Sequence, residues 1–333
     1  MFVLGWLPAA FSSDLTPEQR AIAYLAVEVP RWSTENGCYS CHNNGDAARA
    51  LYSARRLGIA VPPAALADTT AWLVRPNEWD RNRRDPAASD PKLARIQFSA
   101  ALAEAQQAGV VRDPAPLAHA ADSLLPLQHA NGSWPVDTEV AVGSPATYGT
   151  ALATHLARLT LQRADPRRYR EAMARAERWL LAAPARSMPD AAAVLLALAD
   201  VPGAEADRQR RLSLDRITAA RSGDGGWGPF AHTPPEAFDT AVVLLALARS
   251  RAPSLLIQGG RAWLTKAQLP SGGWPATTRP SGSQSYAQHM STTGWATLAL
   301  LETSSGMLFN NRDRARRERA DRLQLQPVAH LGF

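Results

Sequence analysis

The chain has 333 residues, which is enough for one large domain or two average ones, and 46% of them are hydrophobic. Its net charge of +6 is compatible with an anionic partner, but acidic and basic residues are interspersed and no nucleic-acid recognition motif accompanies them. No apolar run is long enough to cross a bilayer. The composition therefore argues against nucleic-acid binding and an integral membrane protein, and it leaves peripheral contact with a membrane open.

The two ends of the chain differ in composition from the middle. Residues 1–16 begin with an apolar run and continue with small residues, like the end of a secretory signal, although the basic start of such a signal is missing. Residues 309–333 carry many charges and read as a solvated helix or a flexible tail, with a docking surface as the alternative. We therefore expect a remnant of a signal segment at 1–16, one folded domain at 17–308 and a charged tail at 309–333.

Both cysteines of the chain stand in one Cys-x-x-Cys-His motif, formed by Cys38, Cys41 and His42. This spacing is the attachment signature of haem c, in which two thiols bind the porphyrin edge and the histidine binds the iron. The motif predicts one covalent haem c with thioethers to Cys38 and Cys41 and with His42 as the proximal ligand. Zinc bound by the same three residues and a distant fourth is the alternative, and an idle pair or a disulfide is a third.

The haem prediction also sets the expected compartment and partner. Haem c is attached outside the cytoplasm in bacteria, so the motif predicts a periplasmic or otherwise exported protein. A haem that passes electrons also requires a redox partner protein.

Three segments share the pattern Gln/Arg-x-x-x-Gly-x-Trp, at residues 128–134, 221–227 and 268–274. The second and third copies lie 47 positions apart, and the first and second lie 93 apart, close to twice that spacing. A degenerate copy is therefore expected between them, around residues 178–184.

Helical patterns flank these segments in a regular alternation. A half-polar pattern such as residues 172–181 precedes a nearly all-apolar one, as at residues 190–198, 240–248 and 293–301. Such pairs predict hairpins with an outer and an inner helix. Counting back to residue 19 gives about six hairpins, which predicts an all-α fold, the (α/α)6 toroid, closed by contact between the first and last hairpins.

The three segments resemble the QW repeats of the squalene cyclase and prenyltransferase family, over roughly residues 115–305. In that family the motif is structural, because its glutamine and tryptophan tie neighbouring hairpins together. The resemblance implies such a scaffold role here for the matching residues, which are Gln128, Trp134, Trp227, Gln268 and Trp274.

The chemistry of that family is matched poorly. Class II terpene cyclases protonate their substrate with the middle aspartate of Asp-x-Asp-Asp-Thr, and the matching stretch here has Phe238 at that position, followed by Asp239 and Thr240. Asp239 is a weak candidate for a catalytic acid, and a helix N-cap is its main interpretation. Protein prenyltransferases hold zinc with a cysteine of the later repeats, where this chain has none.

The repeat register places Cys41 and His42 where other hairpins begin their inner helix, near the mouth of the toroid. The sixth hairpin should lie beside the first, so His289 or Met290 is the candidate distal ligand of the haem iron. The sequence thus predicts a haem c toroid that transfers electrons or performs haem-based chemistry on a hydrophobic guest. The alternative is a terpenoid-cyclase-like enzyme, or an isoprenoid-binding module, whose Cys-x-x-Cys-His is structural or binds zinc.

Overall fold

The structure is a computed structural model that describes residues 15–82, 90–136, 145–250, 252–279 and 284–304. In these parts of the chain every regular element is a helix. The predicted signal remnant falls almost wholly outside the described residues, and the predicted tail does so completely. No helix in the described parts combines the length and apolar character needed to span a bilayer.

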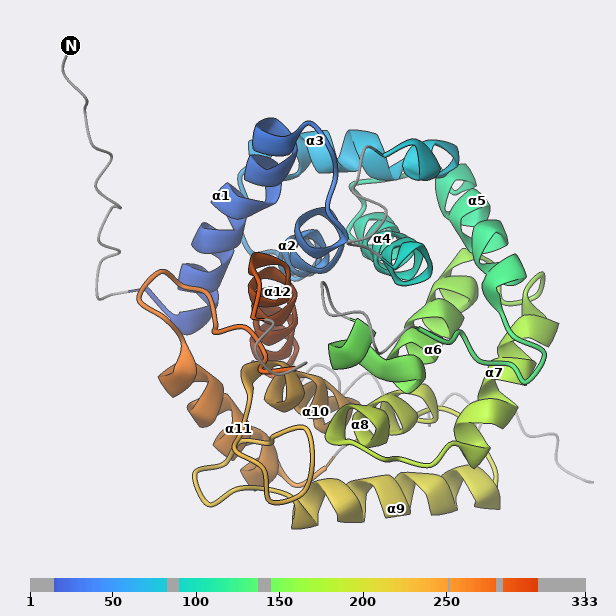
Figure 1. The fold of residues 1–333 in the computed structure, drawn as a ribbon, viewed down its shortest axis with the longest axis vertical. Coiled ribbons are helices and arrows are strands. Elements are labelled where there is room, and N and C mark those ends of the chain that lie inside the picture. The colour runs from blue at the N-terminus through green and yellow to red at the C-terminus, as the bar shows by residue number, and fades with distance from the viewer. Residues whose placement is uncertain (1–14, 83–89, 137–144, 251, 280–283, 305–333) are drawn as a thin grey trace, which may run out of the picture.

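Six helical hairpins form two concentric layers, with one helix of each hairpin outside and the other inside (Figure 1). The outer helices are α1 (Pro17–Asn36), α3 (Ala64–Leu73), α5 (Ala115–Leu124), α7 (Arg170–Ala182), α9 (Ala204–Ala219) and α11 (Ser254–Ala267). The inner layer comprises the π-helix η1 (Cys41–Ala47) with α2 (Ala48–Arg56), then α4 (Pro91–Gln107), α6 (Pro145–Ala164), α8 (Met188–Ala197), α10 (Ala237–Arg249) and α12 (Tyr286–Glu302). Short 3₁₀ turns, η2 (Pro76–Arg81) and η4 (Leu125–Leu127), follow α3 and α5. The predicted (α/α)6 toroid is confirmed.

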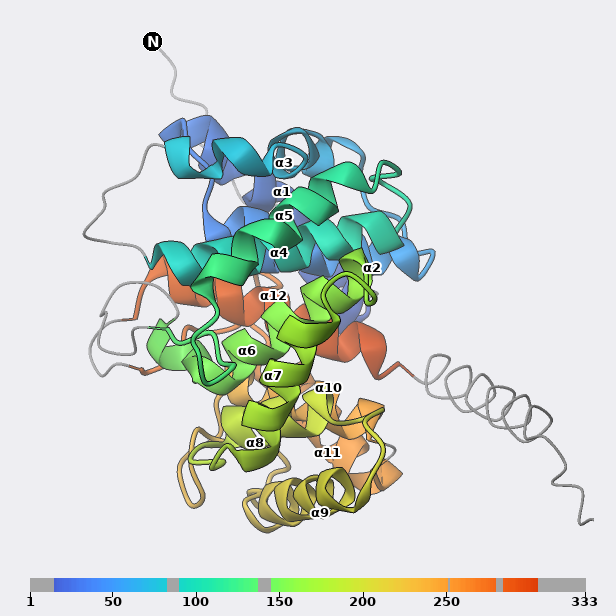
Figure 2. The same ribbon diagram turned by 90° about the vertical axis from the view of Figure 1, so that its right-hand side faces the viewer.

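The inner helices pack side by side around the ring, and α12 returns to η1 and α2 to close it. Seen from the side, α4 and α12 run across the molecule, roughly perpendicular to its longest axis (Figure 2). The inner helices are buried on most faces, which explains why their sequences are nearly continuous runs of alanine, leucine and threonine. The contact between α12 and η1 confirms that the last hairpin is the neighbour of the first.

Each repeat motif fastens its tryptophan inside its own hairpin. The indole Nε1 of Trp134, Trp227 and Trp274 donates to a carbonyl near the end of the preceding outer helix, at 2.8, 2.7 and 2.8 Å. Their backbone N–H groups donate to threonine hydroxyls of the following inner helix, at 2.9 to 3.1 Å. All three rings are fully buried, so each motif joins an outer helix to its inner partner.

The glutamine and glycine of the motif reach the next hairpin. Gln128 Nε2 donates to the Ala172 carbonyl of α7 at 2.8 Å, and Gln268 Nε2 donates to the Pro17 carbonyl of α1 at 2.9 Å. Gly272 lies at φ 96°, and a Cβ atom there would stand 2.5 Å from the backbone oxygen of Arg20. The third motif therefore closes the ring, because it joins the sixth hairpin to the first.

We expect Gly272→Ala to lower the free energy of unfolding by about 2–4 kcal/mol, because alanine is strained at this φ and collides with α1. Gly109→Ala is the matched control, since Gly109 has φ 69° but no atom near its missing Cβ. Strain alone should cost that control about 1 kcal/mol. Urea denaturation measures the free energy of unfolding of both variants. An equal decrease in the two variants would contradict a close contact between Gly272 and α1.

Candidate functional site

The Cys-x-x-Cys-His segment forms the start of the first inner helix. The N-cap Ser40 has an extended backbone, and its Oγ accepts from the His42 N–H at 3.2 Å. The next seven residues form the π-helix η1, and all of them are buried against α1, α4 and α12. A π-helix is rare and is often found at functional sites.

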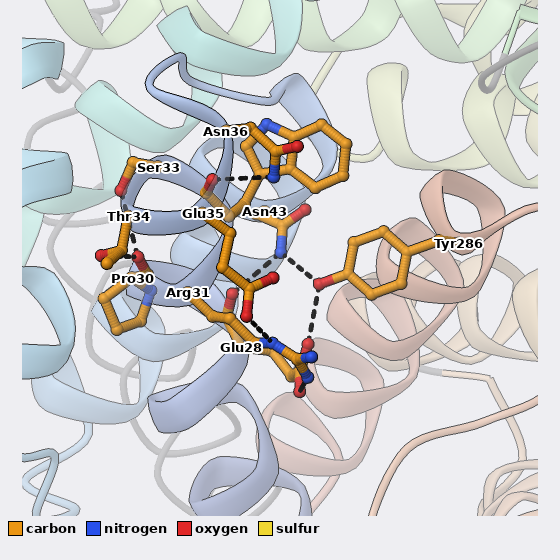
Figure 3. A network of polar contacts seen from close by, with 10 residues as sticks. Glu28, Pro30, Arg31, Ser33, Thr34, Glu35, Asn36, Asn43 and Tyr286 are labelled. Atoms are coloured by element: carbon orange, nitrogen blue, oxygen red, sulfur yellow. Dashed lines mark hydrogen bonds and ion pairs between the residues drawn. The ribbon is translucent and has the colours of Figure 1, made fainter.

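Two asparagines of η1 tie this segment to the outer helices. Asn43 Nδ2 donates to the Glu28 carbonyl at 2.9 Å and to the Tyr286 hydroxyl at 2.8 Å, and that hydroxyl donates to Glu28 Oε2 at 2.7 Å. Figure 3 shows Asn43 between Glu28 of α1 and Tyr286 of α12. Asn44 Nδ2 donates to Thr69 of α3 at 2.8 Å. The polar residues after His42 therefore lock three hairpins together.

The structure contradicts the predicted haem c and its zinc alternative. Cys41 is buried in the apolar core, and His42 Nδ1 lies 3.1 Å from the Ser291 hydroxyl inside the ring. The surface depression beside Cys38 is lined by neither Cys41 nor His42. Within the described residues, no group of three or more histidine, cysteine, aspartate or glutamate side chains is placed to hold a metal.

The motif therefore packs into the protein instead of facing a macrocycle, and the prediction of Cys38, Cys41 and His42 as haem or zinc ligands is wrong. The predicted redox partner rested on this haem and loses its basis. The predicted export is untested.

The two candidate distal ligands have other partners. His289 Nε2 lies 2.8 Å from the Tyr24 hydroxyl of α1, and burial lowers the pKa of His289. Met290 has no exposed surface and belongs to the same apolar cluster as Cys41. Both residues lie in the first two turns of α12. They help to close the ring and take no part in binding iron.

A buried carboxylate, Asp46, lies at the centre of the site and is 1% exposed. Its Oδ2 accepts from Ser291 Oγ at 2.5 Å and from Gln97 Nε2 at 2.8 Å, and its Oδ1 accepts from the Tyr148 hydroxyl. The donors come from α12, α4 and α6, three different inner helices. Because Ser291 also contacts His42 Nδ1, a chain of hydrogen bonds runs from His42 through Ser291 to Asp46.

Three aromatic rings stand beside this carboxylate. Tyr148 of α6, Phe238 of α10 and Trp295 of α12 lie with their ring centres 5.7 Å apart in each pair, and all three are buried. Trp295 Nε1 donates to the Tyr148 hydroxyl at 2.8 Å, and the Arg49 guanidinium carbon lies 4.2 Å from the centre of the Trp295 ring. Burial, together with the Asp46 charge, raises the pKa of Tyr148 well above its usual value, so Tyr148 stays protonated and donates.

Two glycines bring η1 close enough to its neighbours for these contacts. A Cβ atom at Gly45 would stand 3.1 Å from the Gln97 Cβ, and one at Gly294 would stand 2.7 Å from the Asp46 carbonyl oxygen. No sequence motif identified these residues of the site: Asp46, Gln97, Tyr148, Ser291 and Trp295. The sequence does contain one indication of this site. Asp46 ends a run of polar residues in the first inner helix, whereas the other inner helices are mostly apolar.

The weak candidate Asp239 lies elsewhere on the ring and is not the predicted N-cap, because α10 starts at Ala237 and Asp239 is its third residue. Asp239 is fully buried, and burial raises its pKa to about 7, although the Arg279 charge opposes the rise. Arg279 Nη2 lies 3.0 Å from Asp239 Oδ1, in an orientation that forms no hydrogen bond. Asp239 is thus a buried carboxyl with a charge partner but without the donors that surround Asp46.

Comparison with known proteins identifies the fold. No family model and no curated protein matches the sequence. Among solved structures, the chain is similar to a protein from Actinoplanes (TM-score 0.53, 16% identity, covering 86% of this chain and 98% of the other). It is also similar to the type II terpene cyclase MstE from Scytonema without ligand (TM-score 0.54, 12% identity, covering 87% and 99%).

A variant of MstE in complex with its product, merosterolic acid A, matches with a TM-score of 0.50 and 14% identity, covering 87% of this chain and 98% of the other. At these identities the likeness shows a shared toroid fold and no more.

The raised pKa of Asp239 predicts a pH-dependent stability. The folded state holds this proton more tightly than the unfolded state, whose carboxyl has a pKa of about 4, so stability should fall as pH rises from about 4 to about 7. In Asp239→Asn this fall should be smaller, because the amide does not ionise. Thermal unfolding at pH 5 and pH 8 measures the difference. Asp215→Asn, at an exposed carboxyl, is the control, and a wild-type pH dependence in Asp239→Asn would contradict the assignment.

Proposed function

We propose that this chain is an enzyme of the terpenoid-cyclase type that starts the cyclisation of an isoprenoid by protonating a carbon–carbon double bond with Asp46. The observation that supports the proposal most is the Asp46 carboxyl, held by three donors beside three aromatic rings at the centre of the ring of helices. The toroid fold shared with MstE adds to it. This function is the alternative that the QW repeats suggest in the sequence.

The first step uses the neutral, protonated form of Asp46. Its proton passes to an alkene carbon, and the electron pair of the double bond forms the new C–H bond, which leaves a carbocation on the substrate and a carboxylate on Asp46. Tyr148, Ser291 and Gln97 then donate to that carboxylate. Because these donors are already in place in a buried site, the carboxylate is stabilised without the reorganisation that water would need.

The carbocation needs an electron-rich surface that does not react with it. The faces of Tyr148, Phe238 and Trp295 carry negative charge density and attract a cation by about 0.5–2 kcal/mol each. The Arg49 guanidinium already lies over one face of Trp295, so a carbocation in this site relies mainly on Tyr148 and Phe238. Tyr148 and Phe238 have no exposed surface, so an isoprenoid reaches them only if these side chains rearrange.

The acid must regain its proton after each turnover. The chain from His42 through Ser291 to Asp46 provides a path, since the Ser291 hydroxyl can accept a proton from the imidazole side and pass its own to the carboxylate. In this proposal His42, predicted as an iron ligand, belongs to a proton relay. Asp239 is the less favoured acid, because both of its oxygens lack a hydrogen bond within the described residues.

Asp46→Asn tests the proposal, since the amide keeps the shape of the side chain but has no acidic proton. We expect it to lower the rate of cyclisation at least about 100-fold, the lower end of what a general acid contributes. The assay incubates linear isoprenoids of increasing length, as hydrocarbons, alcohols and acids, and detects cyclic products by mass spectrometry.

Asp239→Asn is the control, and we expect it to keep most of the activity. Circular dichroism establishes that both variants fold. The reverse pattern, with activity lost in Asp239→Asn and kept in Asp46→Asn, would assign the acid to Asp239. No cyclic product from the wild type with any substrate would refute the function.

A further inference from the structure

A second group of buried polar side chains lies on the inner helices α2 and α6, apart from the three donors to Asp46. Arg49 belongs to α2, His155 and Arg158 belong to α6, and each of the three is about nine-tenths buried. At the rim of this group, Glu104 Oε1 pairs with Arg56 at 2.7 Å and Glu104 Oε2 pairs with Arg163 at 2.9 Å. The inner helices α2 and α6 therefore carry a cluster of buried arginines that the proposed proton transfer does not use.

Three nitrogens of this cluster lack a hydrogen-bond partner among the described residues: Arg49 Nη1, Arg158 Nε and His155 Nδ1, which is a donor in one of the two neutral tautomers. A buried polar group without a hydrogen-bond partner destabilises the fold, and a charged one does so more strongly. Such orphans are rare and usually mark an ion or ligand that completes the site. Here three of them, from two inner helices, occur in the same part of the interior.

The charges of the cluster do not balance. Glu104 is already shared between Arg56 and Arg163, Glu302 also pairs with Arg56, and Glu177 pairs with Arg158 at 3.3 Å. No carboxylate in the described parts of the chain lies within ion-pair distance of Arg49. Its contact with the face of Trp295 leaves the in-plane N–H groups of the guanidinium directed elsewhere.

The protonation state of His155 also indicates a site for an anion. Burial, and after it the positive charges of Arg158, Arg49, Arg163 and Arg249, lower the pKa of His155 to about 3, so His155 is neutral at physiological pH. Four arginine charges are thus felt at one buried imidazole. A cation would be repelled from this place, whereas an anion would be attracted.

A purely structural role accounts only for the arginines that pair with Glu104, which are Arg56 and Arg163. Arg56 and Arg163 lie in the last turns of α2 and α6, where a positive charge interacts favourably with the helix dipole. Arg49 lies in the middle of the continuous helix formed by η1 and α2, so it gains nothing from a helix end. A bound anion would satisfy Arg49, Arg158 and His155 together.

We infer that Arg49, His155 and Arg158 form a binding site for a phosphate-type oxyanion inside the toroid. Guanidinium N–H groups bind the oxygens of a phosphoryl group well, and Arg49 Nη1 and Arg158 Nε, with the imidazole of His155, offer nitrogens that suit the several oxygens of a diphosphate. The anion has two sources, a free inorganic phosphate or the diphosphate group of an isoprenoid. The second source rests on the proposed function.

Isothermal titration of the full chain with inorganic diphosphate tests the site directly. We expect binding that weakens as salt is added, and at least about a tenfold weaker affinity in Arg49→Gln. Arg168→Gln is the matched control, because Arg168 is 54% exposed, pairs with Asp122 and is not among the arginines whose charge reaches His155. Arg49→Lys, which keeps the charge but loses the fork, should bind with intermediate affinity, and thermal unfolding establishes that each variant folds.

A parallel titration with farnesyl diphosphate separates the two sources. Tighter binding than inorganic diphosphate, with the same dependence on Arg49, assigns the site to an isoprenoid head group, and equal affinity assigns it to the free anion. Failure of the wild type to bind either probe, or unchanged binding in Arg49→Gln, would overturn the inference. Asp46→Asn is titrated as well, because anion binding that persists in an inactive variant keeps this site distinct from the proposed acid.

Discussion

The closure of the ring is the constraint on which the rest of this structure depends. Each hairpin must bury an apolar side against the next hairpin around the ring. The sixth hairpin can do this only by packing against the first. The close approach of Gly272 to the backbone of α1, and of Gly294 to the backbone of η1, makes that contact. Because η1 and α12 meet at this seam, the same contact brings Ser291 to Asp46 and His42, so the step that completes the fold also assembles the candidate site.

The interior of the ring is polar at two levels, although its walls are apolar. A carboxylate with three donors is stable when buried, since each hydrogen bond replaces one that water would have made. Arginines with unpartnered N–H groups are not compensated in this way. In our two proposals the first level supplies the acid and the second binds an oxyanion. Trp295 contacts both levels. Its indole N–H donates to the Tyr148 hydroxyl, and its ring face packs against the Arg49 guanidinium.

The Cys-x-x-Cys-His motif shows how far a short pattern depends on its surroundings. Haem attachment needs the histidine and both sulfurs to face one open space, and spacing along the chain does not fix that. Here Ser40 caps a π-helix whose next residues turn inward, and Asn43 and Asn44 hold that helix against its neighbours. The buried surroundings of Cys41 and His42 are decided by α4 and α12, which are distant in sequence.

The sequence by itself determined the all-α toroid, its six hairpins and the order of outer and inner helices, because these follow from local periodicity and from the repeated Gln-x-x-x-Gly-x-Trp segments. It also placed the last hairpin beside the first. Only the tertiary structure decided which polar side chains share the interior. Asp46, Gln97, Tyr148 and Ser291 come from four inner helices, and no pattern along the chain records their proximity. A hydrogen bond forms only when donor and acceptor lie about 3 Å apart. The packing of the ring of helices decides which side chains come that close.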